Sequence, residues 1–161
     1  MKKALIFVLC IMLAGTAYVR LAPTDVDYWH AKPAQIVPVT AGWRGWVLYP
    51  PEPTDGVQQM PGGAFALKRY DTADAAALLT RLDQIIRATP HTTLLAGSPQ
   101  EGRMTWITRS RVWGFPDYTS AEAIPNGAAT DLQIAARLRF GSSDLGTNAA
   151  RLKQWLADLE P

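Results

Sequence analysis

Five arginine side chains are the residues best suited to bind a ligand, and they are Arg103, Arg109, Arg111, Arg137 and Arg139. A guanidinium group donates paired hydrogen bonds to a carboxylate or phosphate, so clustered arginines favour the binding of an anion or of a partner's acidic groups. Because side chains alternate along a strand, four of the five can project from one sheet face, and Arg111 can join them. The alternative is a solvated face on which they form ion pairs with neighbouring carboxylates.

A second set of candidate residues lies in two dense motifs, RSRVWGFPD at residues 109–117 and FGSSDLGTN at residues 140–148. The glycine of the first motif permits unusual backbone angles and its proline restricts the exit, so its aromatic rings are expected to pack at a corner between strands. In the second motif, Ser143 or Asp144 is expected to cap a helix. A phosphate loop is not favoured, because the Lys-Ser/Thr ending is missing. The candidate residues are Trp113, Gly114, Phe115, Pro116, Asp117, Ser143, Asp144 and Asn148.

Signatures of catalysis and of metal binding are weak. Cys10 is the only cysteine and lies in an apolar run, and the two histidines, His30 and His91, are far apart. Neither a cysteine-based nor a histidine-based metal site is therefore expected. No Gly-x-Ser-x-Gly motif occurs, and an enzyme is not favoured. We expect no catalytic residue, no metal and no cofactor.

The positive charge of the chain is concentrated at its N-terminus. Lys2, Lys3 and Arg20 supply three of the 16 basic residues, which leaves 13 basic and 14 acidic residues in the rest of the chain. The formal net charge of +2 therefore does not indicate a nucleic-acid partner.

Residues 4–19 form an uncharged, mostly aliphatic run. As a helix these 16 residues span about 24 Å, slightly less than a hydrocarbon core, and Arg20 can snorkel to extend the span. The lysines before the run predict an inner-membrane anchor at residues 1–22 with the domain facing the periplasm. The alternative is a signal peptide that is cleaved near Ala17 and releases the domain into the periplasm.

Residues 23–62 contain seven prolines and are predicted to be a connecting region without long helices. Its aromatic run, WRGWVLY at residues 43–49, fits a short strand or flap. An aromatic belt at the membrane interface is the alternative.

Residues 63–161 are predicted to be a two-layer α+β domain, in which an antiparallel sheet of about four or five strands carries two helices on one face. The helices are expected to begin at Asp71 or Thr72 and at about Asp144. The strands are expected at residues 63–70, 92–96, 103–109, 117–124 and 131–140, with a hairpin at Pro125-Asn126-Gly127. The last strand has the clearest alternation, because Leu132, Ile134, Ala136, Leu138 and Phe140 share one face.

The motifs TRSRVWGFPDYT at residues 108–119 and RFGSSDLGTN at residues 139–148 resemble the domain of unknown function 1499 family. LAGSP at residues 95–99, RLAP at residues 20–23 and the pair Trp29-His30 add to the resemblance. It covers residues 63–160 well and residues 18–33 more loosely. The resemblance implies a small domain, often membrane-attached in bacteria, with no established reaction and no catalytic residue to carry over.

These observations predict a non-catalytic envelope domain, anchored by residues 4–19, that binds a membrane, a lipid or an envelope protein as a binding or scaffold domain. One alternative is a carrier of a small apolar or lipid-like ligand in a cavity lined by Trp106, Trp113 and Trp155. A second alternative is a hydrolase that uses Ser110, or Asp117 with Asp144.

Overall fold

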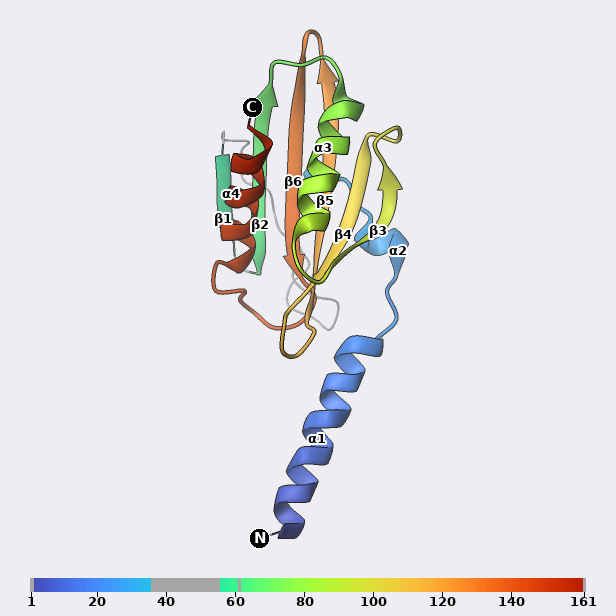
Figure 1. The fold of residues 1–161 in the computed structure, drawn as a ribbon, viewed down its shortest axis with the longest axis vertical. Coiled ribbons are helices and arrows are strands. Elements are labelled where there is room, and N and C mark those ends of the chain that lie inside the picture. The colour runs from blue at the N-terminus through green and yellow to red at the C-terminus, as the bar shows by residue number, and fades with distance from the viewer. Residues whose placement is uncertain (1, 36–55, 61, 161) are drawn as a thin grey trace.

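The computed structural model describes residues 2–35, 56–60 and 62–160. A long N-terminal helix, α1 (Lys2–Leu21), extends from one end of a sheet that carries two helices on one face (Figure 1). The remaining elements are α2 (Val26–Trp29), the 3-10 turn η1 (Pro33–Gln35), β1 (Gly56–Met60), β2 (Gly63–Tyr70), α3 (Ala75–Ala88), β3 (Thr92–Ser98), β4 (Arg103–Arg109), β5 (Pro116–Asn126), β6 (Ala129–Leu138) and α4 (Thr147–Leu159). The predicted α+β class is confirmed. The aromatic run at residues 43–49 lies outside the described residues.

The strands of the described residues form one antiparallel sheet in the order β1-β2-β6-β5-β4-β3. The predicted hairpin joins β5 to β6, with Asn126 opposite Ala129 and Gly127 at a φ of 64°. This sheet has six strands, one more than the upper end of the prediction. The additional strand is β1, which lies in the predicted connecting region. Its sequence GVQQM lacks a strand pattern, and its pairing with β2 is a tertiary contact that the local sequence does not encode.

The predicted apolar N-terminal helix is α1, whose 20 residues rise about 30 Å. By length and composition it could cross a membrane, and 6% of its most apolar window is buried inside the protein. An uncleaved anchor and a signal sequence share this character.

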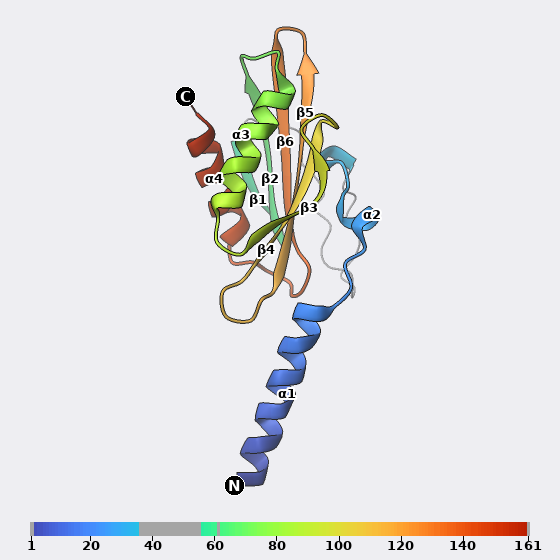
Figure 2. The ribbon, with the colours of Figure 1, turned by 45° about the vertical axis from the view of Figure 1, so that its right-hand side comes forward.

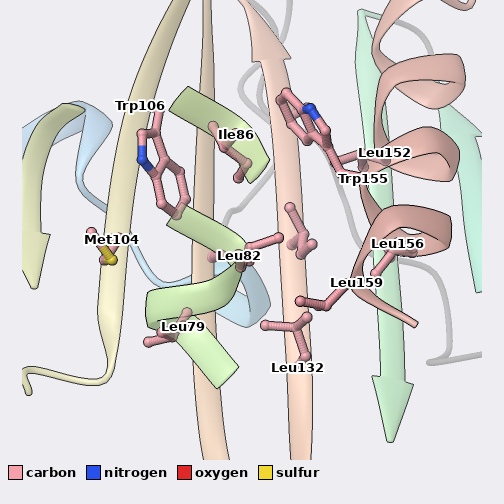
Figure 3. Packing of buried hydrophobic residues seen from close by; sticks show 14 of the residues in the cluster. Leu79, Leu82, Ile86, Met104, Trp106, Leu132, Leu152, Trp155, Leu156 and Leu159 are labelled. Carbon is pink, nitrogen blue, oxygen red and sulfur yellow. The ribbon is translucent and has the colours of Figure 1, made fainter. Parts of the chain in front are cut away.

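The hydrophobic core lies between the sheet and the two helices. Leu132, Ile134 and Ala136 of β6 are fully buried there, so the predicted apolar face is confirmed for these residues. The prediction extended the strand too far, because β6 ends at Leu138, and Leu138 and Phe140 line a cleft at the end of the sheet instead of the core. Figure 3 shows how the leucines of α3 and α4 meet the strands. Trp106 and Trp155 are buried in this core, whereas Trp113 is exposed in a loop, so the three rings do not line a shared cavity.

Both helices begin later than predicted. The cap of α3 is Asp74, which accepts a hydrogen bond from the backbone N–H of Ala77, instead of Asp71 or Thr72. The N-cap of α4 is Gly146 in the left-handed conformation, instead of Ser143 or Asp144. The Asp144 carboxylate still accepts from the Asn148 N–H at 2.8 Å, because the loop folds back over the first turn.

The face of the sheet opposite α3 and α4 carries residues 22–35, which we call the strap. Figure 2 shows α2 on the far side of the sheet from α3 and α4. The strap is held by Trp29, which is 3% exposed and stacks on Tyr118 of β5 with ring centroids 3.8 Å apart. Residues that were predicted to connect an anchor to a domain therefore form part of the folded domain.

Candidate functional site

The strap covers Arg137, which was predicted to project from this face. Its guanidinium group donates to the Trp29 carbonyl oxygen at 2.7 Å and lies 4.9 Å from the centre of the Trp29 ring. Only 2% of the residue is exposed, and no carboxylate of the described residues forms an ion pair with it. Burial lowers the pKa of Arg137 to about 10. The interpretation as an open, solvated face is therefore wrong for this part of the sheet.

Two more of the predicted arginines also bind the strap. Arg139 donates to the carbonyl oxygens of Ala22 and Pro23, at 3.4 and 2.8 Å, and Arg103 donates to His30 Nε2 at 3.2 Å. These contacts explain why positively charged side chains gather on this face, since carbonyl oxygens and a neutral imidazole accept their hydrogen bonds. The predicted anion-binding patch therefore does not assemble from Arg103, Arg137 and Arg139 as free groups.

A buried chain of hydroxyl groups completes the attachment of the strap. His30 Nδ1 lies 2.8 Å from Thr105 Oγ1, which lies 2.9 Å from Ser120 Oγ, and that hydroxyl donates to the Trp29 carbonyl at 3.1 Å. Because His30 Nε2 accepts from Arg103, the neutral ring carries its proton on Nδ1. Burial, and secondarily the Arg103 charge, lower the pKa of His30.

The two predicted motifs meet in a cleft at the end of the sheet that adjoins α1. This cleft has a volume of about 710 Å³. The loop after β4, the loop after β6, the start of α4 and the turn between α3 and β3 form its walls. Its arginines are Arg109, Arg111 and Arg151, its carboxylates are Asp117 and Asp144, and its apolar wall is Phe115, Leu138 and Phe140. The structure thus unites in one cleft Arg109 and Arg151, which are 42 positions apart in the chain.

Asp117 and Arg151 form the polar centre of the cleft. Arg151 Nη1 lies 3.4 Å from Asp117 Oδ2 and 2.8 Å from Asn148 Oδ1, and both side chains of the ion pair are less than one-fifth exposed. Burial raises the pKa of Asp117, while the Arg151 charge opposes that rise and the Asp144 charge adds to it. Arg151 was missed in the sequence, although its position three residues after Asn148 places both side chains on one helix face.

The loop between β4 and β5 is a corner in which the glycine takes an unusual backbone angle, as predicted. The predicted packing of its aromatic rings is incomplete, because Trp113 and Phe115 are 43% and 41% exposed. Ser110 N donates to the Phe115 carbonyl and Gly114 N donates to the Ser110 carbonyl. The Ser110 hydroxyl accepts from Phe115 N at 2.9 Å. Gly114 has a φ of 75°, and a Cβ there would lie 3.0 Å from the Arg20 side chain. Pro116 is buried at the first position of β5. Ser110 is thus occupied in a turn.

The same loop contacts α1. Arg20 Nη2 donates to the Val112 carbonyl at 3.3 Å, and the Tyr18 ring packs edge-on to Phe140 with centroids 6.2 Å apart. Trp113 and Phe115 line a groove of about 340 Å³ whose other residues are Met12, Gly15, Thr16 and Val19 of α1. Phe115 therefore forms part of the wall of both the cleft and this groove.

This arrangement can bind an anion beside an apolar group. Three guanidinium groups outnumber the two carboxylates of the cleft, and the raised pKa of Asp117 further favours positive charge. Among the described residues there is no group of three or more His, Cys, Asp or Glu side chains that could hold a metal ion. The hydroxyl groups of Ser110 and Ser143 accept backbone N–H groups, of Phe115 and Leu145 respectively.

Comparison with known proteins identifies the family. The chain belongs to the family described as protein of unknown function (DUF1499), whose model matches residues 53–159. The resemblance seen in the two motifs is thereby confirmed, and the match includes β1. Comparison with curated proteins found no match. Among solved structures, the crystal structure of TTHA0849 from Thermus thermophilus is similar, with a TM-score of 0.31 and 10% identity over 59% of this chain and 92% of that chain. A likeness this distant supports no functional inference.

Proposed function

We propose that this protein is a membrane-anchored, non-catalytic binding domain of the bacterial envelope whose cleft accepts the anionic headgroup of a lipid. The observation that carries the proposal is the composition of the cleft. The cleft is lined by Arg109, Arg111 and Arg151 together with an apolar wall, and one member of that wall, Phe115, also lines the groove against α1. A lipid has a charged headgroup and apolar chains, so it needs a site with both positively charged and apolar side chains.

The position of the cleft supports a lipid as the ligand. The cleft lies at the end of the sheet nearest α1, and the Arg20 and Tyr18 contacts hold α1 against its rim. If α1 is an uncleaved anchor, the cleft faces the bilayer surface, where anionic headgroups are concentrated. Lys2 and Lys3, the first two residues of α1, favour an orientation with the domain in the periplasm.

A titration with a short-chain phosphatidylglycerol tests this proposal on the full-length chain in neutral detergent. Arg111 is exposed, so the Arg111→Gln variant is expected to keep the fold while it weakens binding roughly 10- to 150-fold, the equivalent of one charged hydrogen bond. The control is Arg69→Gln, which removes the same charge from β2, outside the cleft, and is expected to bind normally. Equal binding by all three proteins, or binding by none, would contradict the proposal.

A hydrolase is a second candidate, favoured by one observation. Asp117 has a raised pKa and shares the cleft with Asp144, and such a carboxyl group can act as a general acid. The competing observation is that Asp144 accepts the N–H groups of Gly146 and Asn148. Mass spectrometry of the lipid after incubation separates the two candidates. A product formed by the wild type and not by Asp117→Asn would favour the hydrolase, whereas unchanged lipid favours binding.

A further inference from the structure

The tip of the loop between β4 and β5 exposes several apolar side chains. Val112 is 69% exposed, Trp113 is 43% exposed and Phe115 is 41% exposed. Single exposed hydrophobic residues are common on protein surfaces, but three within four consecutive positions, in a loop of fixed shape, indicate a contact with an apolar partner. The charged neighbour Arg111 is exposed on the same loop.

The contacts with α1 define the level at which this loop lies. Trp113 and Phe115 share their groove with residues of α1 between Met12 and Val19. Met12 precedes Arg20 by eight residues, so it lies about 12 Å along the helix axis from the level of Arg20, while Val19 lies about 1.5 Å from it. If α1 spans a bilayer with Arg20 at the surface, the loop occupies the outermost 12 Å or so of the membrane. Tryptophan side chains are enriched at this depth, and amphipathic segments bury their apolar faces there.

Part of the loop backbone is hydrogen-bonded, which lowers the cost of moving the loop out of water. The N–H groups of Ser110, Gly114 and Phe115 each have an acceptor within the loop, and the Val112 carbonyl accepts from Arg20. Unpaired backbone groups would make burial in lipid unfavourable. The guanidinium group of Arg20 remains on the surface side, where it can contact phosphate groups.

We propose that residues 111–115 are an interfacial insertion loop that enters the outer leaflet of the bilayer beside α1. The occupant of this apolar surface is the lipid that surrounds α1. The inference rests on the proposed anchoring by α1 and does not depend on what the cleft binds. In the inserted loop, Phe115 would lie between the bilayer and the cleft.

Depth-dependent fluorescence quenching tests the inference on the full-length chain in phosphatidylglycerol–phosphatidylcholine nanodiscs. An environment-sensitive label is attached at Val112→Cys in a Cys10→Ser background, and quenching by lipids that carry a nitroxide near the headgroup is measured. The matched control is Ala128→Cys in the same background, because Ala128 is exposed at the opposite end of the sheet, in the β5–β6 turn. The native Cys10, labelled in the otherwise unchanged chain, reports on α1 itself.

We expect strong quenching at Cys10 by lipids that carry the nitroxide deep in the acyl chain. We expect quenching by the shallow nitroxide to be at least threefold greater at position 112 than at position 128. Equal quenching at positions 112 and 128, with Cys10 quenched, would overturn the inference and leave the anchor intact. An unquenched label at Cys10 would overturn the anchoring by α1 and the inference with it. Binding of phosphatidylglycerol in the cleft is tested separately by the titration in detergent.

Discussion

Replacement of Trp29 by alanine should destabilise the whole domain, because the strap would lose its largest contact. Trp29 is 3% exposed, stacks on Tyr118 and lies over Arg137. Truncation of a buried tryptophan costs about 3–5 kcal/mol. The Trp29 carbonyl remains in the variant, so its hydrogen bonds from Arg137 and Ser120 are retained and the loss comes from the ring. Against a typical total of about 5–15 kcal/mol, this is a large fraction of the free energy of unfolding.

Urea unfolding of the full-length chain in neutral detergent, followed by near-ultraviolet circular dichroism, measures this loss. Trp29→Phe keeps a ring above Arg137 and should cost less than half as much as Trp29→Ala. Trp113→Ala is the matched control, because this tryptophan is 43% exposed and its loss should cost less than about 1 kcal/mol. If Trp29→Ala cost no more than Trp113→Ala, the strap would not be a stabilising part of the fold.

Further predictions concern the backbone and the charges. Gly97→Ala should cost at least about 3 kcal/mol of the free energy of unfolding, because the added Cβ would lie 2.1 Å from the Arg103 carbonyl oxygen. Gly127→Ala is the control, because its added Cβ has no neighbour within 4 Å and it should cost about 1 kcal/mol for its positive φ. Equal urea midpoints for the two variants would refute the clash at Gly97. The stability advantage of Asp117→Asn over the wild type should grow as the pH rises from 3.8 towards 7. The folded state raises the pKa of Asp117, so its protonated form contributes stability that is lost as the pH rises through the folded pKa. Asp131→Asn should show the opposite trend, because hydrogen bonds, first from Arg69, lower the pKa of Asp131 to about 2, and the wild type loses that stability as the pH falls from 3.8 towards 2. Urea unfolding between pH 2 and 7 measures both trends, and parallel curves for the two variants would contradict the assignment.

Local sequence periodicity was sufficient to predict most of the architecture. The alternation of Leu132, Ile134 and Ala136 correctly predicted which face of β6 meets the helices. The spacing of leucines and isoleucines predicted α3, and the Pro-Asn-Gly run predicted the hairpin. These features depend on residues a few positions apart, so they can be read without knowledge of the rest of the chain. The strand β1 escaped prediction because its stability comes from pairing with β2.

For the candidate site, the sequence alone determined which residues could bind a ligand, but not which of them remain available because they bind no other part of the protein. It identified the five arginines and both motifs, and the motifs do meet in the cleft through Asp117 and Asp144. Only the tertiary structure decided that Arg137 is buried beneath Trp29, 108 residues earlier in the chain, and that Arg151 joins Asp117. An alternating pattern tells which face of a strand a side chain occupies. What covers that face depends on contacts between distant segments, whose pairing is set by packing of the folded chain and has no local signal.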